Sequence, residues 1–220
     1  MNTHIQIEGD ESSKFIYYLG TSYTYENITN GILRKRNHFV KGVENGLREI
    51  YDENGLPIIF AEIKNGLKDG HYLEYHQNRK IKSDFTYKEG HKNGLCRTYY
   101  LSGNIESESN YEKGRKNGEY KTFYKSENGK IESIYNYKNG ILNGYSAHFR
   151  ENKTKQWETN FFDGVKNGEE KYFHENGKIS KQLHYFYGEL EGTYYEYNEE
   201  GNKIKFKIYS QGEVIHEENY

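Results

Sequence analysis

The sequence predicts an all-β protein: an elongated, single-layer antiparallel β-meander or solenoid of about eight two-stranded hairpin repeats with a period of about 24 residues. Two observations predict this fold class, the composition and a repeat of glycines. The chain has 23 Gly, one Pro and 33% hydrophobic residues, but 24 Tyr, 11 Phe and one Trp. Glycine disfavours helices and aromatic residues favour strands. The near balance of 31 basic and 33 acidic residues argues against disorder.

Glycines mark the repeat. The first glycine of each linker follows the previous one by 24 residues, with one interval of 26; these are Gly42, Gly66, Gly90, Gly114, Gly140, Gly164, Gly188 and Gly212. A second glycine comes four residues after each of the first seven, at Gly46, Gly70, Gly94, Gly118, Gly144, Gly168 and Gly192. Five positions further on, every unit has an aromatic residue: Tyr51, Tyr75, Tyr99, Phe123, Phe149, Phe173 and Tyr197. A fixed period of this length predicts a repeat array.

Each unit is expected to be a hairpin. A turn signal lies midway through most units, as in Asn54-Gly55, Asn128-Gly129 and Asn176-Gly177. Asn-Gly favours a two-residue type I′ turn, because both central residues of that turn need positive φ. The linker between units is also of hairpin length, so consecutive strands should pair antiparallel throughout. One hairpin cannot bury a face alone, and stability should therefore come from stacked neighbours.

The chain is predicted to form one domain with atypical ends. Residues 1–19 are expected to form an N-terminal capping hairpin around Gly9-Asp10. The array should span residues 20–212, beginning with a divergent unit at Gly20 that turns at Asn30-Gly31. Residues 213–220 are expected to be a C-terminal half-repeat cap. Terminal units of repeat arrays are usually atypical in this way.

This hairpin of glycines and aromatics resembles the MORN repeat in its shorter variant. The resemblance is clearest from Asn167-Gly168 to Phe173, at Glu175-Asn176-Gly177-Lys178-Ile179, and from Tyr185 to Gly188. The Tyr-x-Gly opening with Trp, typical of the better-known form, is mostly missing, and Trp157 is the only Trp. Chains made solely of such variants resemble a bacterial antitoxin or immunity family. The resemblance implies a non-enzymatic protein that neutralises a cognate toxin by direct binding; the alternative is a structural scaffold or adaptor for protein assembly or membrane-lipid association.

No catalytic, cofactor-binding or metal-binding residue is predicted, and the protein is expected not to be an enzyme. The Gly-x-x-Asn-Gly linkers join strand to strand, whereas a phosphate-binding loop needs a following helix. His76 and His174 occupy the same slot four units apart, too far to share a metal ion. Cys96 is the lone candidate nucleophile, and its slot favours a structural role. The short basic run Arg34-Lys35-Arg36 is interpreted as a solvated edge strand.

The expected partner is another protein. The net charge of −2 argues against nucleic acid and makes a membrane partner unlikely. The single Cys and the absence of an evident signal or apolar span favour a cytoplasmic location. A bacterial source is implied by the resemblance alone. We expect a monomer or a weak homodimer, because an open sheet leaves unpaired edges.

One sheet face is the candidate partner-binding surface. Positions 2, 4 and 6 after the second glycine should share a face, since side chains alternate along a strand. These positions vary from unit to unit and are rich in Tyr, His and Arg, which are enriched at interfaces. The alternative is that the rings only cover the second side of a thin sheet. The predicted partner-binding residues are Tyr100, Tyr120, Tyr124, His148, Arg150, Tyr172 and His174.

Overall fold

The computed structural model describes residues 3–9, 12–19, 21–126 and 129–220. Within these residues every regular element is a β-strand, so the predicted all-β fold class is confirmed. No described segment forms a helix long and apolar enough to span a membrane. The turn positions predicted at Asp10, Gly20 and Asn128 lie outside the described residues.

The chain divides into two compact units. The first unit comprises Met1–Ile105 and Tyr111–Gly114, and the second comprises Glu106–Asn110 and Arg115–Tyr220. Strand β11 (Ile105–Glu112) therefore contributes residues to both units.

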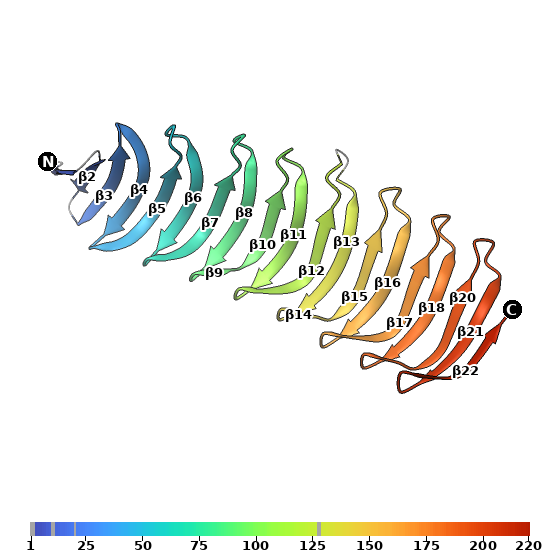
Figure 1. The fold of residues 1–220 in the computed structure, drawn as a ribbon. Coiled ribbons are helices and arrows are strands. Elements are labelled where there is room, and N and C mark those ends of the chain that lie inside the picture. Colours follow the sequence, from blue (N-terminus) through green and yellow to red (C-terminus); the bar gives the residue numbers. More distant parts are fainter. Residues whose placement is uncertain (1–2, 10–11, 20, 127–128) are drawn as a thin grey trace. The chain divides into compact units, whose positions relative to one another are not determined.

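The first unit is an antiparallel meander (Figure 1). Each strand pairs with its neighbour in sequence, and β8 pairs with both β9 and β10. The strands are β1 (Thr3–Gly9), β2 (Ser12–Leu19), β3 (Ser22–Thr29), β4 (Ile32–Val40), β5 (Val43–Tyr51), β6 (Pro57–Lys64), β7 (Leu67–Tyr75), β8 (Ile81–Lys88), β9 (His91–Lys92) and β10 (Gly94–Tyr99).

The second unit repeats this arrangement, and Figure 1 shows its strands side by side as a row of bent arcs. Short strands β14 and β19 precede β15 and β20, and both members of each pair lie against the same preceding strand. The strands are β12 (Arg115–Phe123), β13 (Ile131–Lys138), β14 (Ile141–Leu142), β15 (Gly144–Phe149), β16 (Lys155–Phe162), β17 (Val165–Phe173), β18 (Ile179–Phe186), β19 (Glu189–Leu190), β20 (Gly192–Tyr197), β21 (Lys203–Ser210) and β22 (Glu213–Asn219).

The turn at the middle of most hairpin repeats differs from the predicted type I′ turn. At Asn176-Gly177 only the glycine has positive φ, and the Gly177 N–H donates a 3.0 Å hydrogen bond to the His174 carbonyl. This is a longer loop that ends in a left-handed residue, not a two-residue type I′ turn. The linkers instead have two consecutive residues with positive φ, as at Asn65 (52°) and Gly66 (79°). The type I′ pattern therefore falls mainly between units.

The second glycine of each linker lies within a strand irregularity, not in a turn. At Gly70, φ is +119°, and a Cβ there would lie 1.8 Å from a carboxylate oxygen of Glu62. Pairing of β6 with β7 shifts register between Ala61 and Ile63, opposite this glycine. A side chain at Gly70 would be both strained and crowded. The positive φ is shared by the second glycines of the other linkers, and it accounts for the recurrence of glycine there.

The buried interior is thin, as the composition predicts. Among the described residues, the buried apolar positions are Ala61, Ile63, Cys96, Ala147 and Leu183. Buried polar positions are mostly small as well: Asn37, Ser83, Ser109, Ser133, Ser146, Thr159 and Glu170. Small residues thus fill the sheet centre, while aromatic rings beside them stay half-buried and retain a wet edge.

Candidate protein-binding face

One row of directly opposed residues crosses the second unit. It contains position 4 of successive hairpin repeats, counted from the second glycine of each linker, and the residues paired with it on the intervening strands. Directly opposed residues project from the same sheet face, so the row defines one surface. The row runs through Thr122, Ser133, His148, Trp157, Tyr172, Lys181, Glu196 and Lys205.

Two of the predicted residues, His148 and Tyr172, lie in this row. His148 stacks on Trp157 with ring centroids 6.2 Å apart, and its Nδ1 lies 2.8 Å from the Ser133 hydroxyl. Trp157 in turn lies opposite Tyr172. These half-buried rings are therefore held by their neighbours.

Position 2 forms a parallel row on the same face, two residues away along each strand. Its central part consists of Ser146, Thr159, Glu170 and Leu183, and all four residues are buried. Tyr120, a third predicted residue, occupies position 2 at β12 and lies opposite Tyr135. The face thus has a buried central floor with aromatic side chains around it.

A lysine over two tyrosine rings recurs on this face. The Lys116 ammonium lies 3.4 Å from the ring centroid of Tyr120 and 4.9 Å from that of Tyr137. The first unit has the same arrangement, with Lys68 4.1 Å from Tyr72 and 4.8 Å from the ring of Tyr87. Each contact is a cation–π interaction.

Sequence reasoning missed these lysines. The signal was present, because lysine recurs two residues before the second glycine at Lys68, Lys92, Lys116 and Lys166. An aromatic residue also recurs three positions before the first glycine, as at Tyr87 and Tyr137. Its packing against position 2 depends on the local register at the linker.

The predicted residues at position 6 make bonds within the chain. The Tyr124 hydroxyl donates to the Phe149 carbonyl at 2.7 Å, and Arg150 donates to the Phe173 carbonyl at 2.6 Å. The His174 ring lies 2.9 Å from the carbonyl oxygen of Tyr197. Register shifts between positions 4 and 5, as at Tyr172 and Phe173, interrupt the simple alternation that the sequence argument assumed. Position 6 therefore joins each hairpin repeat to the next one in the sequence.

The seventh predicted residue, Tyr100, belongs to the first unit, whereas the other six belong to the second. Its backbone N–H donates to the Asn104 carbonyl, and its carbonyl accepts from Gly103 at 2.8 Å. Tyr100 thus begins a mid-unit turn. The partner-binding role of all seven residues stays a prediction.

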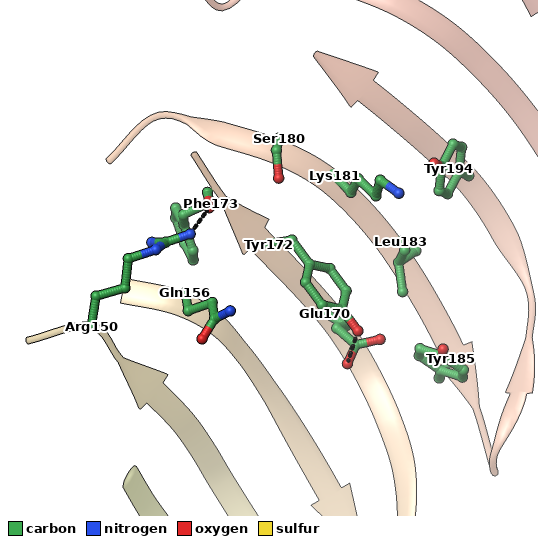
Figure 2. A pocket seen from close by; sticks show the side chains of 10 residues that line it. All are labelled: Arg150, Gln156, Glu170, Tyr172, Phe173, Ser180, Lys181, Leu183, Tyr185 and Tyr194. Carbon is green, nitrogen blue, oxygen red and sulfur yellow. Dashed lines mark hydrogen bonds between the residues drawn. The ribbon is translucent and has the colours of Figure 1, made fainter. Parts of the chain in front are cut away.

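The second unit has an open recess of about 520 Å³ on this face (Figure 2). Its floor includes Glu170 and Leu183, and its sides include the rings of Tyr172, Tyr185 and Tyr194. Burial, followed by the charge of Glu170, raises the pKa of Tyr185 to about 12. Burial also raises the pKa values of Tyr172 and Tyr194. These phenols therefore stay protonated and able to donate hydrogen bonds at neutral pH.

The described residues contain no group of three or more His, Cys, Asp or Glu side chains placed to hold a metal ion. Cys96 is 4% exposed, and burial raises the pKa of its thiol. A buried thiol with a raised pKa is a poor nucleophile, which fits the structural role predicted for it.

A comparison with known protein families finds matches within the repeat array. Residues 92–113, 116–139 and 166–186 match the MORN repeat variant. Repeats of this family are often protein-interaction or lipid-binding modules, and the family is not known as enzymatic. Comparison with curated proteins finds no match. The repeat matches indicate a binding or scaffolding protein, and they do not extend to an antitoxin or immunity family.

Proposed function

We propose that this is a non-enzymatic binding protein of the bacterial cytoplasm, which neutralises a cognate toxin by direct contact as an antitoxin or immunity protein. The MORN repeat matches support the binding part of this proposal. The resemblance stated from the sequence supports the toxin as partner. Contact is proposed along the face of the second unit that contains His148, Tyr172 and Tyr120.

The observation that supports this face best is the way its rings are held. His148 is fixed between Ser133 and Trp157, and Tyr120 lies under Lys116. These side chains are half-buried, so they offer contact area without first having to be ordered. Ordering of rotamer-rich side chains costs about 0.5–1.5 kcal/mol each on binding, and rings that are already fixed avoid much of this cost.

The test is capture and rescue. The tagged chain is co-expressed with the product of the adjacent gene, and recovery of a stable complex together with rescue of growth is expected. Double substitution of His148→Ala and Tyr172→Ala should weaken capture at least tenfold. Lys171→Ala is the matched control, because Lys171 neighbours Tyr172 in β17 and projects from the opposite face. Equal capture by the double variant and the control would discard this face.

A second candidate function is a scaffold or adaptor, and a separate surface favours it. Exposed apolar side chains gather at the linker turns of the second unit. Tyr187 contacts the rings of Phe162 and Phe186, at centroid distances of 6.0 and 4.8 Å. Ile141 and Val165 are exposed at neighbouring linkers. Such patches mark interaction surfaces.

Co-sedimentation with anionic and neutral vesicles separates the two functions. The toxin-binding proposal predicts that the chain stays in the supernatant with both kinds of vesicle. Salt-sensitive sedimentation that is lost on Phe186→Ser and Tyr187→Ser would favour the lipid-associated adaptor.

A further inference from the structure

Glu170 is the one carboxylate at position 2 of the seven glycine-marked repeats. Three of these repeats have Tyr there, at Tyr72, Tyr120 and Tyr194, and the other residues at this position are Arg48, Cys96 and Ser146. In the second unit, adjacent repeats have Ser146 and Glu170 at this position. The volume that a phenol ring fills elsewhere is therefore missing here, and the recess of about 520 Å³ lies at this place.

Glu170 has a hydrogen-bonding capacity that the described chain does not use. Its side chain is 3% exposed. One carboxylate oxygen accepts from the Lys166 ammonium at 2.5 Å and from the Tyr172 hydroxyl at 3.3 Å. The other oxygen is buried without a hydrogen-bond partner. A buried acceptor left unpaired is costly, so a donor supplied by a ligand would be favoured there.

The charges around the recess select the kind of donor. Lys166 already neutralises Glu170, and its ammonium lies 4.9 Å from the ring of Tyr185, so the place of a cation is taken. Arg150 also lines the recess, and its hydrogen bonds go to backbone carbonyls, including that of Phe173 (Figure 2). Lys181 is exposed at the rim, opposite Glu196. Around the recess three cations, Arg150, Lys166 and Lys181, therefore stand against two carboxylates, Glu170 and Glu196, so an acidic group is favoured there over a further cation.

We propose that the recess receives a neutral hydrogen-bond-donating side chain, such as Asn or Gln, from an acidic loop of the protein partner. The donor bonds the free oxygen of Glu170, its aliphatic part packs against Tyr172 and Tyr194, and the flanking acidic residues lie near Arg150 and Lys181. This inference rests on the proposed function, because it assigns the site and the chemistry of the protein that binds.

Two variants of the full chain test the recess. Glu170→Tyr introduces the residue that three other repeats have at this position, Tyr72, Tyr120 and Tyr194, so it should fold and fill the recess. Lys181→Glu reverses the rim charge, and Lys138→Glu makes the same charge change at an exposed site at the end of β13. The probes are short labelled peptides that alternate Asp with Asn or Lys with Asn, and binding is followed by fluorescence anisotropy.

The Asp-Asn peptide should bind the parent chain and Lys138→Glu alike, and its Kd should rise at least tenfold in Glu170→Tyr and in Lys181→Glu. Preference for the Lys-Asn peptide, or unchanged binding by both recess variants, would overturn the inference. If Glu170→Tyr fails to fold, Lys181→Glu still decides the result. Capture of the adjacent gene product is measured in parallel. If both recess variants still capture the protein, the recess is not its binding site, and the proposed function stands. If the peptide binds but no protein is captured, the recess inference stands and the proposed function fails.

Discussion

The Tyr124 hydroxyl donates a hydrogen bond of 2.7 Å to the carbonyl oxygen of Phe149, which lies one repeat further along the chain. The same acceptor position is used by different donors elsewhere. Arg150 donates to the Phe173 carbonyl, and the ring of His76 lies 2.7 Å from the Tyr99 carbonyl in the first unit. The variety of residues at position 6 is therefore compatible with one structural task, the joining of successive hairpins.

Tyr124→Phe removes this hydroxyl and keeps the ring. We expect the free energy of unfolding of the full chain to fall by about 1 kcal/mol, because the Phe149 carbonyl loses its side-chain donor. Urea denaturation followed by circular dichroism measures the change. The denaturant midpoint should fall with little change in slope.

Tyr135→Phe is the control for this prediction. The Tyr135 ring packs against Tyr120 and Trp157, and among the described residues its hydroxyl has no hydrogen-bond partner. This variant should unfold at nearly the parent midpoint. Equal destabilisation by both substitutions would show that the Tyr124 hydroxyl contributes nothing specific.

The hairpin array could be predicted because its signals are local and repeated. The spacing from Gly66 to Gly90 fixes the period, and the aromatic residues at Tyr75 and Tyr99 fix the strands between turns. The turn types were harder to predict. Asn176-Gly177 has the composition of a type I′ turn, but the hydrogen bond from Gly177 to His174 closes a longer loop. Loop length depends on the register of the flanking strands, and a dipeptide does not specify that register.

The candidate face could be predicted only in part. Alternation along a strand correctly assigns His148 and Tyr172 to one row, because no register shift separates positions 2 and 4. It cannot predict that Arg150 reaches the Phe173 carbonyl, since this contact depends on the stacking distance between units. The unpaired oxygen of Glu170 also depends on side-chain geometry. The sequence shows only that a carboxylate stands at a position that varies between repeats.

Acid should destabilise the second unit partly through Glu158. Burial raises the pKa of this carboxyl, but hydrogen bonds from Lys155 at 2.6 Å and Tyr145 at 3.0 Å outweigh it, so the pKa lies below its ordinary value. A carboxyl with a lowered folded-state pKa contributes stability above the unfolded pKa of about 4.3, and the contribution is lost as pH falls through the folded pKa. Thermal unfolding of the parent chain should therefore show a Tm that drops as pH decreases below this value.

Glu158→Gln isolates this contribution. The variant should have a lower Tm than the parent at neutral pH, and the difference should shrink as the pH is lowered. Glu175→Gln changes an exposed carboxyl and should follow the parent curve. A Glu158→Gln curve that stays parallel to the parent across the acid range would contradict the assignment.

Lys153 occupies a backbone position that favours glycine. Its φ is +72°, and it ends the mid-unit loop of its repeat at the place where Gly103, Gly177 and Gly201 stand in others. A left-handed conformation costs a residue with a Cβ roughly 1–2 kcal/mol, whereas glycine loses about 0.5–1 kcal/mol of chain entropy. Lys153→Gly should therefore raise the free energy of unfolding by about 0.5–1 kcal/mol. Lys153→Ala removes the same side chain but keeps the Cβ, so it should give no such gain. Urea denaturation measures the free energy of unfolding of both variants. An alanine variant as stable as the glycine variant would show that the lysine side chain, and not the backbone conformation, limits stability at this turn.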